Sequence, residues 1–116
     1  MPTVYLVQEP RAAKDLSSAQ RYGTLQPILG AGDDVGLTPG PALHKLARAL
    51  RRFAGDDYLC AAGGDPLGLA LALVALRNET PLREVQFLRW ERERDIHGRR
   101  LQGVGFYVPT KVQLYV

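Results

Sequence analysis

The sequence predicts a single α/β domain over residues 1–116, with a mixed sheet and two helices. Two cap-and-proline signals, Thr38-Pro39 and Asp65-Pro66, each precede an apolar segment of helical length, and strand-length apolar runs lie between them. Two alternating runs around a glycine turn then predict a C-terminal antiparallel hairpin. The expected order is strand, strand, helix, strand, helix, strand, strand, which is typical of a small α/β fold.

The first third of the chain contains two strands and one turn. Thr3 to Val7 alternates as a strand, which Glu9-Pro10 ends, and residues 15–19 predict a turn or short helical turn that Asp15 can cap. Residues 24–29 predict an edge strand, because Pro27 has no N–H to donate to a neighbouring strand. Residues 30–36 hold three glycines and two aspartates, which indicates a mobile surface loop.

The first full helix is expected to begin at Pro39, where the Thr38 hydroxyl can cap free N–H groups. Apolar residues then recur at spacings of three and four, as one face of a helix requires. They are Leu43, Leu46, Ala47, Leu50 and Phe53. Basic residues occupy another face, and Gly55 ends the helix.

Residues 57–68 predict a strand, a glycine turn and a second helix in one segment. Tyr58 to Ala62 is apolar throughout, as expected for a central strand covered on both faces. Asp65 predicts the cap of a helix over residues 67–77, which residues 78–81 then break. This helix is apolar on nearly all sides, so the sheet or a second subunit must cover more than one of them.

The C-terminal hairpin is predicted from strand patterns on both sides of residues 95–99. Residues 85–93 alternate, with Trp90 on one face, and Gly98 provides the positive φ that a tight loop needs. The return strand runs over residues 103–108, Pro109 interrupts it, and a last alternating run reaches Val116.

The amino-acid composition indicates what class of protein this is. The chain is 46% apolar and 23% charged with a formal net charge of +3, which is typical of a folded globular domain. Cys60 is the only cysteine and lies in an apolar run, so we expect a reduced, inert core thiol and a cytoplasmic protein. The N-terminus lacks the pattern of a signal peptide, and the longest apolar stretch is about ten residues, too short to span a membrane. We therefore expect no membrane partner.

Arginine dominates the cations and clusters in two places. A basic surface with interleaved aromatics can pair with phosphates and stack on bases, which predicts a nucleic-acid interface. The candidate residues are Arg48, Arg52, Trp90, Arg92, Arg94, Arg99, Arg100 and Tyr107. The alternative is that neither cluster binds a ligand. The hairpin residues would then be solvated and form cross-strand ion pairs, and the helix residues would form the solvent-exposed face of an amphipathic helix.

The turn after the central strand is a weaker candidate for anion binding. Gly63 and Gly64 precede a helix N-terminus, where backbone N–H groups can hold an anion. The turn matches neither the dinucleotide-binding pattern nor the P-loop, and Asp65 would occupy the free amides itself. A purely structural turn is the alternative. No catalytic set, metal site or cofactor is suggested by the remaining Ser, His, Asp and Cys residues.

A resemblance to a known group rests on motifs spread through most of the chain. These are residues 5–10, residues 15–19 with Tyr22-Gly23, residues 57–59 with 64–66, residues 88–90 and residues 106–109. In this combination the sequence resembles small accessory proteins encoded by bacteriophages, for which no activity is assigned. The resemblance implies a viral protein that works in the cytoplasm of a bacterial host, near replication or transcription.

Together these observations lead to a functional hypothesis and two alternatives. We expect a non-enzymatic accessory protein that binds single-stranded nucleic acid, or a protein that processes it, through the arginine-rich surface. The first alternative is a protein–protein module, a homodimer or an inhibitor of a host factor, that uses the apolar second helix. A nucleotide-binding enzyme built on the glycine turn is a third class.

Overall fold

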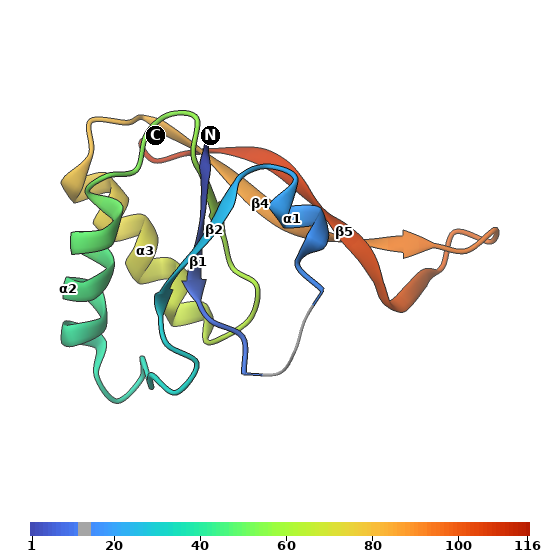
Figure 1. The fold of residues 1–116 in the computed structure, drawn as a ribbon, viewed down its shortest axis with the longest axis horizontal. Coiled ribbons are helices and arrows are strands. Elements are labelled where there is room, and N and C mark those ends of the chain that lie inside the picture. Colours follow the sequence, from blue (N-terminus) through green and yellow to red (C-terminus); the bar gives the residue numbers. More distant parts are fainter. Residues whose placement is uncertain (12–14) are drawn as a thin grey trace.

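The computed structural model describes residues 1–11 and 15–116. The elements are β1 (Thr3–Gln8), α1 (Ser17–Gln20), β2 (Thr24–Leu29), α2 (Pro39–Leu50), β3 (Tyr58–Cys60), α3 (Pro66–Glu79), β4 (Glu84–Arg94) and β5 (Arg100–Gln113). Their order confirms the predicted one, and the expected helical turn forms the short helix α1 (Figure 1).

The strands form one mixed sheet in the order β2-β1-β3-β4-β5. β1 runs parallel to both β2 and β3, β3 runs parallel to β4, and β4 pairs antiparallel with β5. The predicted C-terminal antiparallel hairpin is therefore confirmed. The predicted edge position of the strand that contains Pro27 is also confirmed, because β2 is an edge strand of the sheet.

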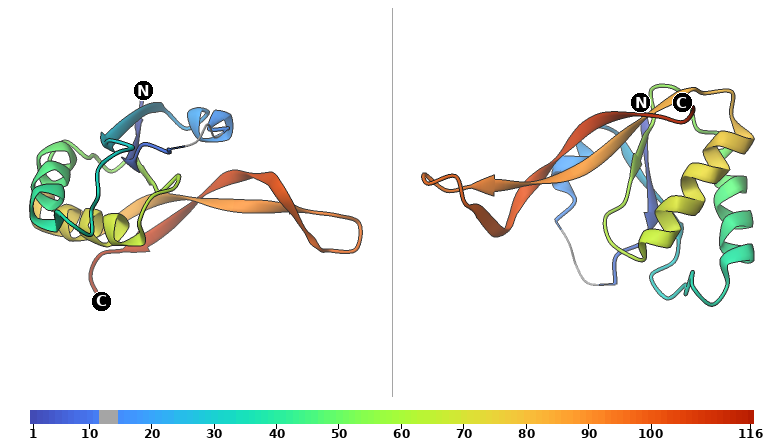
Figure 2. Two further views of the ribbon diagram at one scale, coloured as in Figure 1. Left: turned by 90° about the horizontal axis from the view of Figure 1, so that it is seen from below. Right: turned by 180° about the vertical axis from the view of Figure 1, so that it is seen from behind.

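The helices cover the two faces of the sheet, with α2 and α3 on one face and α1 on the other (Figures 1 and 2). Alternate residues of each strand supply the two cores. Tyr5, Val7 and Leu59 belong to the larger cluster under α2 and α3. Val4 and Cys60 belong to the smaller cluster beside α1, so Cys60 is a core residue as predicted.

The β4–β5 hairpin extends well beyond the rest of the sheet. β3 has three residues and its pairing with β4 ends at Leu88, so from Arg89 onward β4 is paired only with β5. We call residues 89–108 the arm. Figure 1 shows the arm projecting from the body, which gives the molecule a longest dimension of 44 Å against 30 and 29 Å.

Both predicted helix starts are correct, but only one of the predicted caps forms. The Asp65 carboxylate accepts a hydrogen bond of 2.9 Å from the Leu67 N–H at the start of α3. α2 starts at Pro39 as predicted, yet the Thr38 hydroxyl does not cap it and instead donates to the Asp34 carbonyl oxygen at 2.9 Å. This side chain secures the preceding loop, as threonine hydroxyls often do.

Several predicted boundaries also need correction, beginning with that of α2, which ends at Leu50 and does not reach Gly55. β3 ends at Cys60 because the chain turns toward Gly63, whereas α3 continues two residues past the predicted end, to Glu79. Pro109 does not interrupt the last strand: β5 runs through it and on to Gln113, with Pro109 opposite Leu88. An edge strand tolerates proline because half of its N–H groups face away from the sheet.

Candidate functional site

The pairing register of the arm brings five of the predicted site residues onto one face. Trp90 lies opposite Tyr107, and Arg94 lies opposite Arg100. Directly opposite residues of an antiparallel pair share a face, and Arg92 shares it by strand alternation. We call this set, Trp90, Arg92, Arg94, Arg100 and Tyr107, the Trp90 face.

Trp90 and Tyr107 differ in what they can offer to a ligand. Their ring centroids lie 5.0 Å apart in an edge-to-face arrangement with an interplanar angle of 65°. Trp90 is 39% exposed, whereas Tyr107 is 6% exposed, and burial raises the pKa of its phenol to about 12. Trp90 therefore presents the free aromatic surface and Tyr107 supports it from below.

Helix α1 fixes the base of this face. The Tyr107 N–H donates to Ser18 Oγ at 3.1 Å, and the Tyr22 hydroxyl donates to the Tyr107 carbonyl oxygen at 3.4 Å. Both contacts join β5 to the α1 side of the sheet. They hold the part of the hairpin that carries the aromatic pair.

A glycine makes room for the indole. A Cβ added to Gly105 would lie 2.8 Å from Trp90 Cζ2 and would also overlap the Glu91 carbonyl oxygen. Gly105 lies opposite Arg92, next to the Trp90–Tyr107 pair in the ladder. A glycine inside a strand often marks this kind of close approach.

A hollow opens where the arm leaves the body. It has a volume of about 520 Å³ and is lined by Trp90 and Tyr107 from the arm, by Gly103 and Asp15, and by residues 61–63 after β3. We call it the arm-base pocket. Its volume lies within the range of small-molecule sites, and it joins Gly63 to the Trp90 face, two candidates that the sequence had kept apart.

Glu91 and Glu93 of β4 alternate away from the Trp90 face. Glu91 alternates with Trp90 along the strand and forms an ion pair with Arg89, which lowers the pKa of the Glu91 carboxyl. At the tip, Asp95 accepts hydrogen bonds from the His97 and Arg99 N–H groups. Arg99 thus belongs to the turn, where Gly98 has the expected positive φ of 77°.

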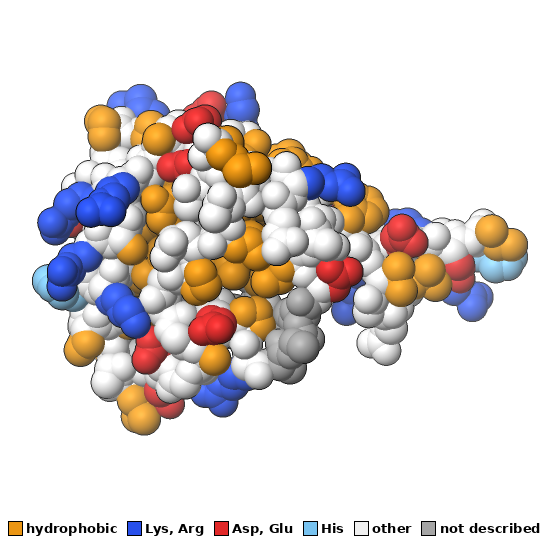
Figure 3. Space-filling view, viewed as in Figure 1, with side chains coloured by type: hydrophobic (Ala, Val, Ile, Leu, Met, Phe, Trp, Pro, Cys, Tyr) orange, Lys and Arg blue, Asp and Glu red, His pale blue; other side chains and the backbone are white. Residues whose placement is uncertain are grey.

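The two predicted arginines of the first helix do not join the arm. Arg48 and Arg52 line a separate cleft between α2 and β2, together with His44 and Lys45. Figure 3 shows Lys and Arg side chains gathered along α2, at the end of the molecule opposite the arm. The eight candidate residues therefore do not form one surface: five make up the Trp90 face, two line this cleft, and Arg99 lies in the turn at the tip of the arm.

Gly63 and Gly64 lie at the carboxyl ends of the parallel strands, where α/β sheets commonly bind ligands. The pocket there, of about 470 Å³, is lined by both glycines, by Arg11 and by four acids. These acids are Glu9, Asp33, Asp34 and Asp65. Gly64 has a φ of +82°, and an added Cβ would overlap the Gln8 amide oxygen. The two glycines thus serve chain reversal and close packing, in acidic surroundings that oppose an anion.

Neither a metal-binding cluster nor a membrane-spanning helix is found within residues 1–11 and 15–116. No group of three or more His, Cys, Asp or Glu side chains among them is placed to hold a metal ion. No helix in the described part of the chain has the length and apolar character needed to cross a membrane.

Comparison with known proteins places the chain in a viral family. The model of the family described as phage Pam3 gp32-like protein matches residues 2–97. The chain belongs to this family. No curated protein and no solved structure matches the chain. The match to the phage Pam3 gp32-like family ends at the tip of the arm, so β5, which carries Tyr107 and Arg100, lies beyond the matched residues.

Sequence reasoning missed several residues that shape the arm-base pocket. Asp15 was predicted only as a cap, and its carboxylate does accept a hydrogen bond from the Ser17 N–H at 2.9 Å. Gly103 and Gly105 were not assigned any role. The available signal was the presence of two glycines within a predicted strand, which suggests a bulge or a close backbone approach.

Proposed function

We propose that this phage-type protein binds single-stranded nucleic acid through the Trp90 face of the arm, in the cytoplasm of the bacterial host. One observation carries the proposal: the pairing of β4 with β5 gathers an exposed indole and three arginines on one side of a projecting ribbon. Proteins commonly bind single-stranded nucleic acid by stacking its bases on aromatic rings and by pairing its phosphates with cationic side chains.

The indole supplies the stacking surface. The accessible part of Trp90 borders the arm-base pocket, which is large enough for one nucleobase. Residues 61–63 line the pocket from the body side. A base held there would stack on Trp90 and turn its polar edge toward this backbone.

The arginines supply the electrostatic contacts. Arg92 lies on the Trp90 face, and the opposed pair Arg94 and Arg100 lies farther toward the tip, while Glu91 and Glu93 alternate onto the other face. The Arg94 guanidinium donates to the Gly98 carbonyl oxygen at 2.9 Å, which leaves donors free for a phosphate. The strand would run along the arm, with its backbone beside these side chains.

The proposal is tested by fluorescence anisotropy with a labelled single-stranded oligonucleotide at low salt. Trp90→Ala should weaken binding by about fivefold to a hundredfold, because stacking on one aromatic contributes about 1–3 kcal/mol per base. Phe106→Ala is the matched control, since Phe106 lies on the same hairpin, is 40% exposed and alternates onto the opposite face from Tyr107. Equal losses in both variants, or no binding by the unmodified chain at about 100 μM, would reject the proposal.

Salt dependence provides a separate test of the phosphate contacts. Neutralising three phosphates of a single strand predicts a slope of about −2 for log K against log salt concentration. Arg92→Gln combined with Arg100→Gln should make this slope shallower. A slope that the double substitution leaves unchanged would contradict contact through these side chains.

A second candidate function is a protein–protein module that uses α3. Leu67 is 39% exposed and Val74 is 45% exposed, and their spacing of seven residues puts them on one stripe of the helix. A second copy of the chain could cover this stripe. Analytical ultracentrifugation should then detect a dimer of the 12.8 kDa chain that Val74→Glu dissociates. A monomer at micromolar concentration would exclude this alternative.

A further inference from the structure

We infer that the cleft between α2 and β2 binds a nucleoside di- or triphosphate. The cleft has a volume of about 540 Å³ and is lined on the helix side by His44, Lys45, Arg48 and Arg52. We call it the α2 cleft. It lies at the opposite end of the molecule from the arm, so it is independent of the surface proposed for single-stranded nucleic acid.

Helical spacing concentrates the positive charge on the wall of the cleft. His44, Arg48 and Arg52 follow one another at intervals of four residues, which aligns them on one side of α2 and of the turn that follows it. The described residues that line the cleft include no Asp or Glu. A concave surface with cations on one wall and no described acid raises the local concentration of anions.

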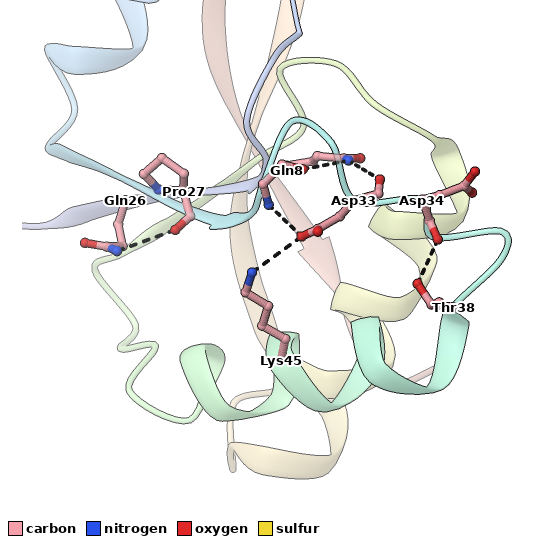
Figure 4. A network of polar contacts seen from close by, with 8 residues as sticks. Gln8, Gln26, Pro27, Asp33, Asp34, Thr38 and Lys45 are labelled. Atoms are coloured by element: carbon pink, nitrogen blue, oxygen red, sulfur yellow. Dashed lines mark hydrogen bonds and ion pairs between the residues drawn. The ribbon is translucent and has the colours of Figure 1, made fainter.

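The two arginines are available for a ligand. Lys45 extends from α2 toward Asp33 in the loop after β2, with an ion pair of 3.4 Å, as Figure 4 shows. Among the described residues, the side chains of Arg48 and Arg52 form no hydrogen bond and no ion pair. Each guanidinium can therefore place two parallel N–H donors on a phosphate, and two such groups one helical turn apart match adjacent phosphates.

The opposite wall fits the nucleoside. Pro27 and Ile28 of β2 line the cleft beside Gln26, so an apolar surface lies next to an amide that can donate and accept hydrogen bonds. Figure 4 shows Gln26 and Pro27 on β2, across from α2. Tyr5 forms part of the cleft as well, with its ring fixed 5.5 Å from that of Phe53. Mixed walls of this kind are typical of small-molecule sites.

The test is isothermal titration calorimetry of the whole chain with ATP, with tripolyphosphate and with a short single-stranded oligonucleotide. ATP should bind, and Arg48→Gln combined with Arg52→Gln should weaken it by about tenfold to a hundredfold, as expected for two charge-assisted contacts. Arg51→Gln is the matched control. Arg51 is the C-cap residue of α2 but pairs with Glu79 at 3.2 Å, outside the cleft, so this variant should bind ATP like the unmodified chain.

Each alternative outcome overturns the inference. No ATP binding at about 1 mM, or an equal loss in Arg51→Gln, would show that the cleft is not a specific site. If tripolyphosphate binds as tightly as ATP, the nucleoside contributes nothing to the affinity, and the cleft is a polyphosphate site and not a nucleotide site. Oligonucleotide binding that the double substitution abolishes, without ATP binding, would assign the cleft to a nucleic-acid backbone. Trp90→Ala should leave ATP binding unchanged, which separates this test from that of the arm.

Discussion

The rings of Trp90 and Tyr107 contact each other in an edge-to-face arrangement, and the two residues lie directly opposite each other in the β4–β5 ladder. Tyr107 belongs to the core cluster beside α1, whereas Trp90 is the largest exposed side chain at the start of the arm. The pair therefore connects the buried core to the projecting hairpin. A substitution in either ring should change both the stability of the arm and its affinity for any ligand that contacts the indole.

Gly105→Ala should displace the indole from this position. The added methyl group would overlap the Glu91 carbonyl oxygen and lie 2.8 Å from Trp90 Cζ2, so both the β4–β5 backbone and the ring must move, at a cost of about 1–3 kcal/mol in the free energy of unfolding. Trp90 is the only tryptophan, so its fluorescence emission reports the displacement directly. Gly40→Ala is the control, because nothing lies within 4 Å of the added atom and its emission spectrum should not change.

Tyr107 should make stability fall in alkaline solution. Burial, with a smaller contribution from Cys60, raises the pKa of its phenol from 10.0 to about 12. The unfolded chain loses this proton first, so folding stability is fully present below pH 10 and decreases as the pH rises toward 12. Urea unfolding at a series of pH values should show this decrease. Tyr107→Phe removes the titrating group, and an identical pH profile in that variant would assign the effect elsewhere.

Local rules were sufficient to predict the order of the elements. Pro27 indicated an edge strand and Asp65 a helix cap, and both statements hold because proline chemistry and carboxylate capping act within a few residues. The hydroxyl of Thr38 was harder to predict. It can donate to a nearby carbonyl as readily as it accepts from a helix N–H, and the Asp34 carbonyl is within reach.

The candidate site could be predicted only in part. Strand alternation correctly placed Trp90 and Arg92 on one side, because that pattern depends on β4 alone. Which residues of β5 oppose them depends on the register, and the shift between Arg92 and Arg94 next to Gly103 could not be read from the sequence. The separation of Arg48 from the arm required the strand order, which depends on long-range pairing.

The two helix starts should respond differently to removal of their polar side chains. Asp65→Ala removes the hydrogen bond to the Leu67 N–H and should cost about 1 kcal/mol in the free energy of unfolding. Thr38→Ala removes an exposed hydroxyl that bonds to a loop carbonyl rather than to the helix, so its cost should stay below about 0.5 kcal/mol. Chemical denaturation of both variants compares them directly. A larger loss for Thr38→Ala would mean that its hydroxyl caps α2 in solution.

Asp57 should be among the polar residues to which stability is most sensitive. Its buried carboxylate accepts one hydrogen bond from the Thr3 N–H at 2.9 Å and another from the Ala54 N–H at 2.8 Å, so it ties the start of β1 to the turn before β3. Asp57→Ala leaves two backbone donors without this partner and should cost about 2–4 kcal/mol. The exposed neighbour Asp56 is the control, and Asp56→Ala should change the unfolding free energy by less than about 0.5 kcal/mol. Denaturant midpoints that coincide for the two variants would show that water replaces the carboxylate without loss.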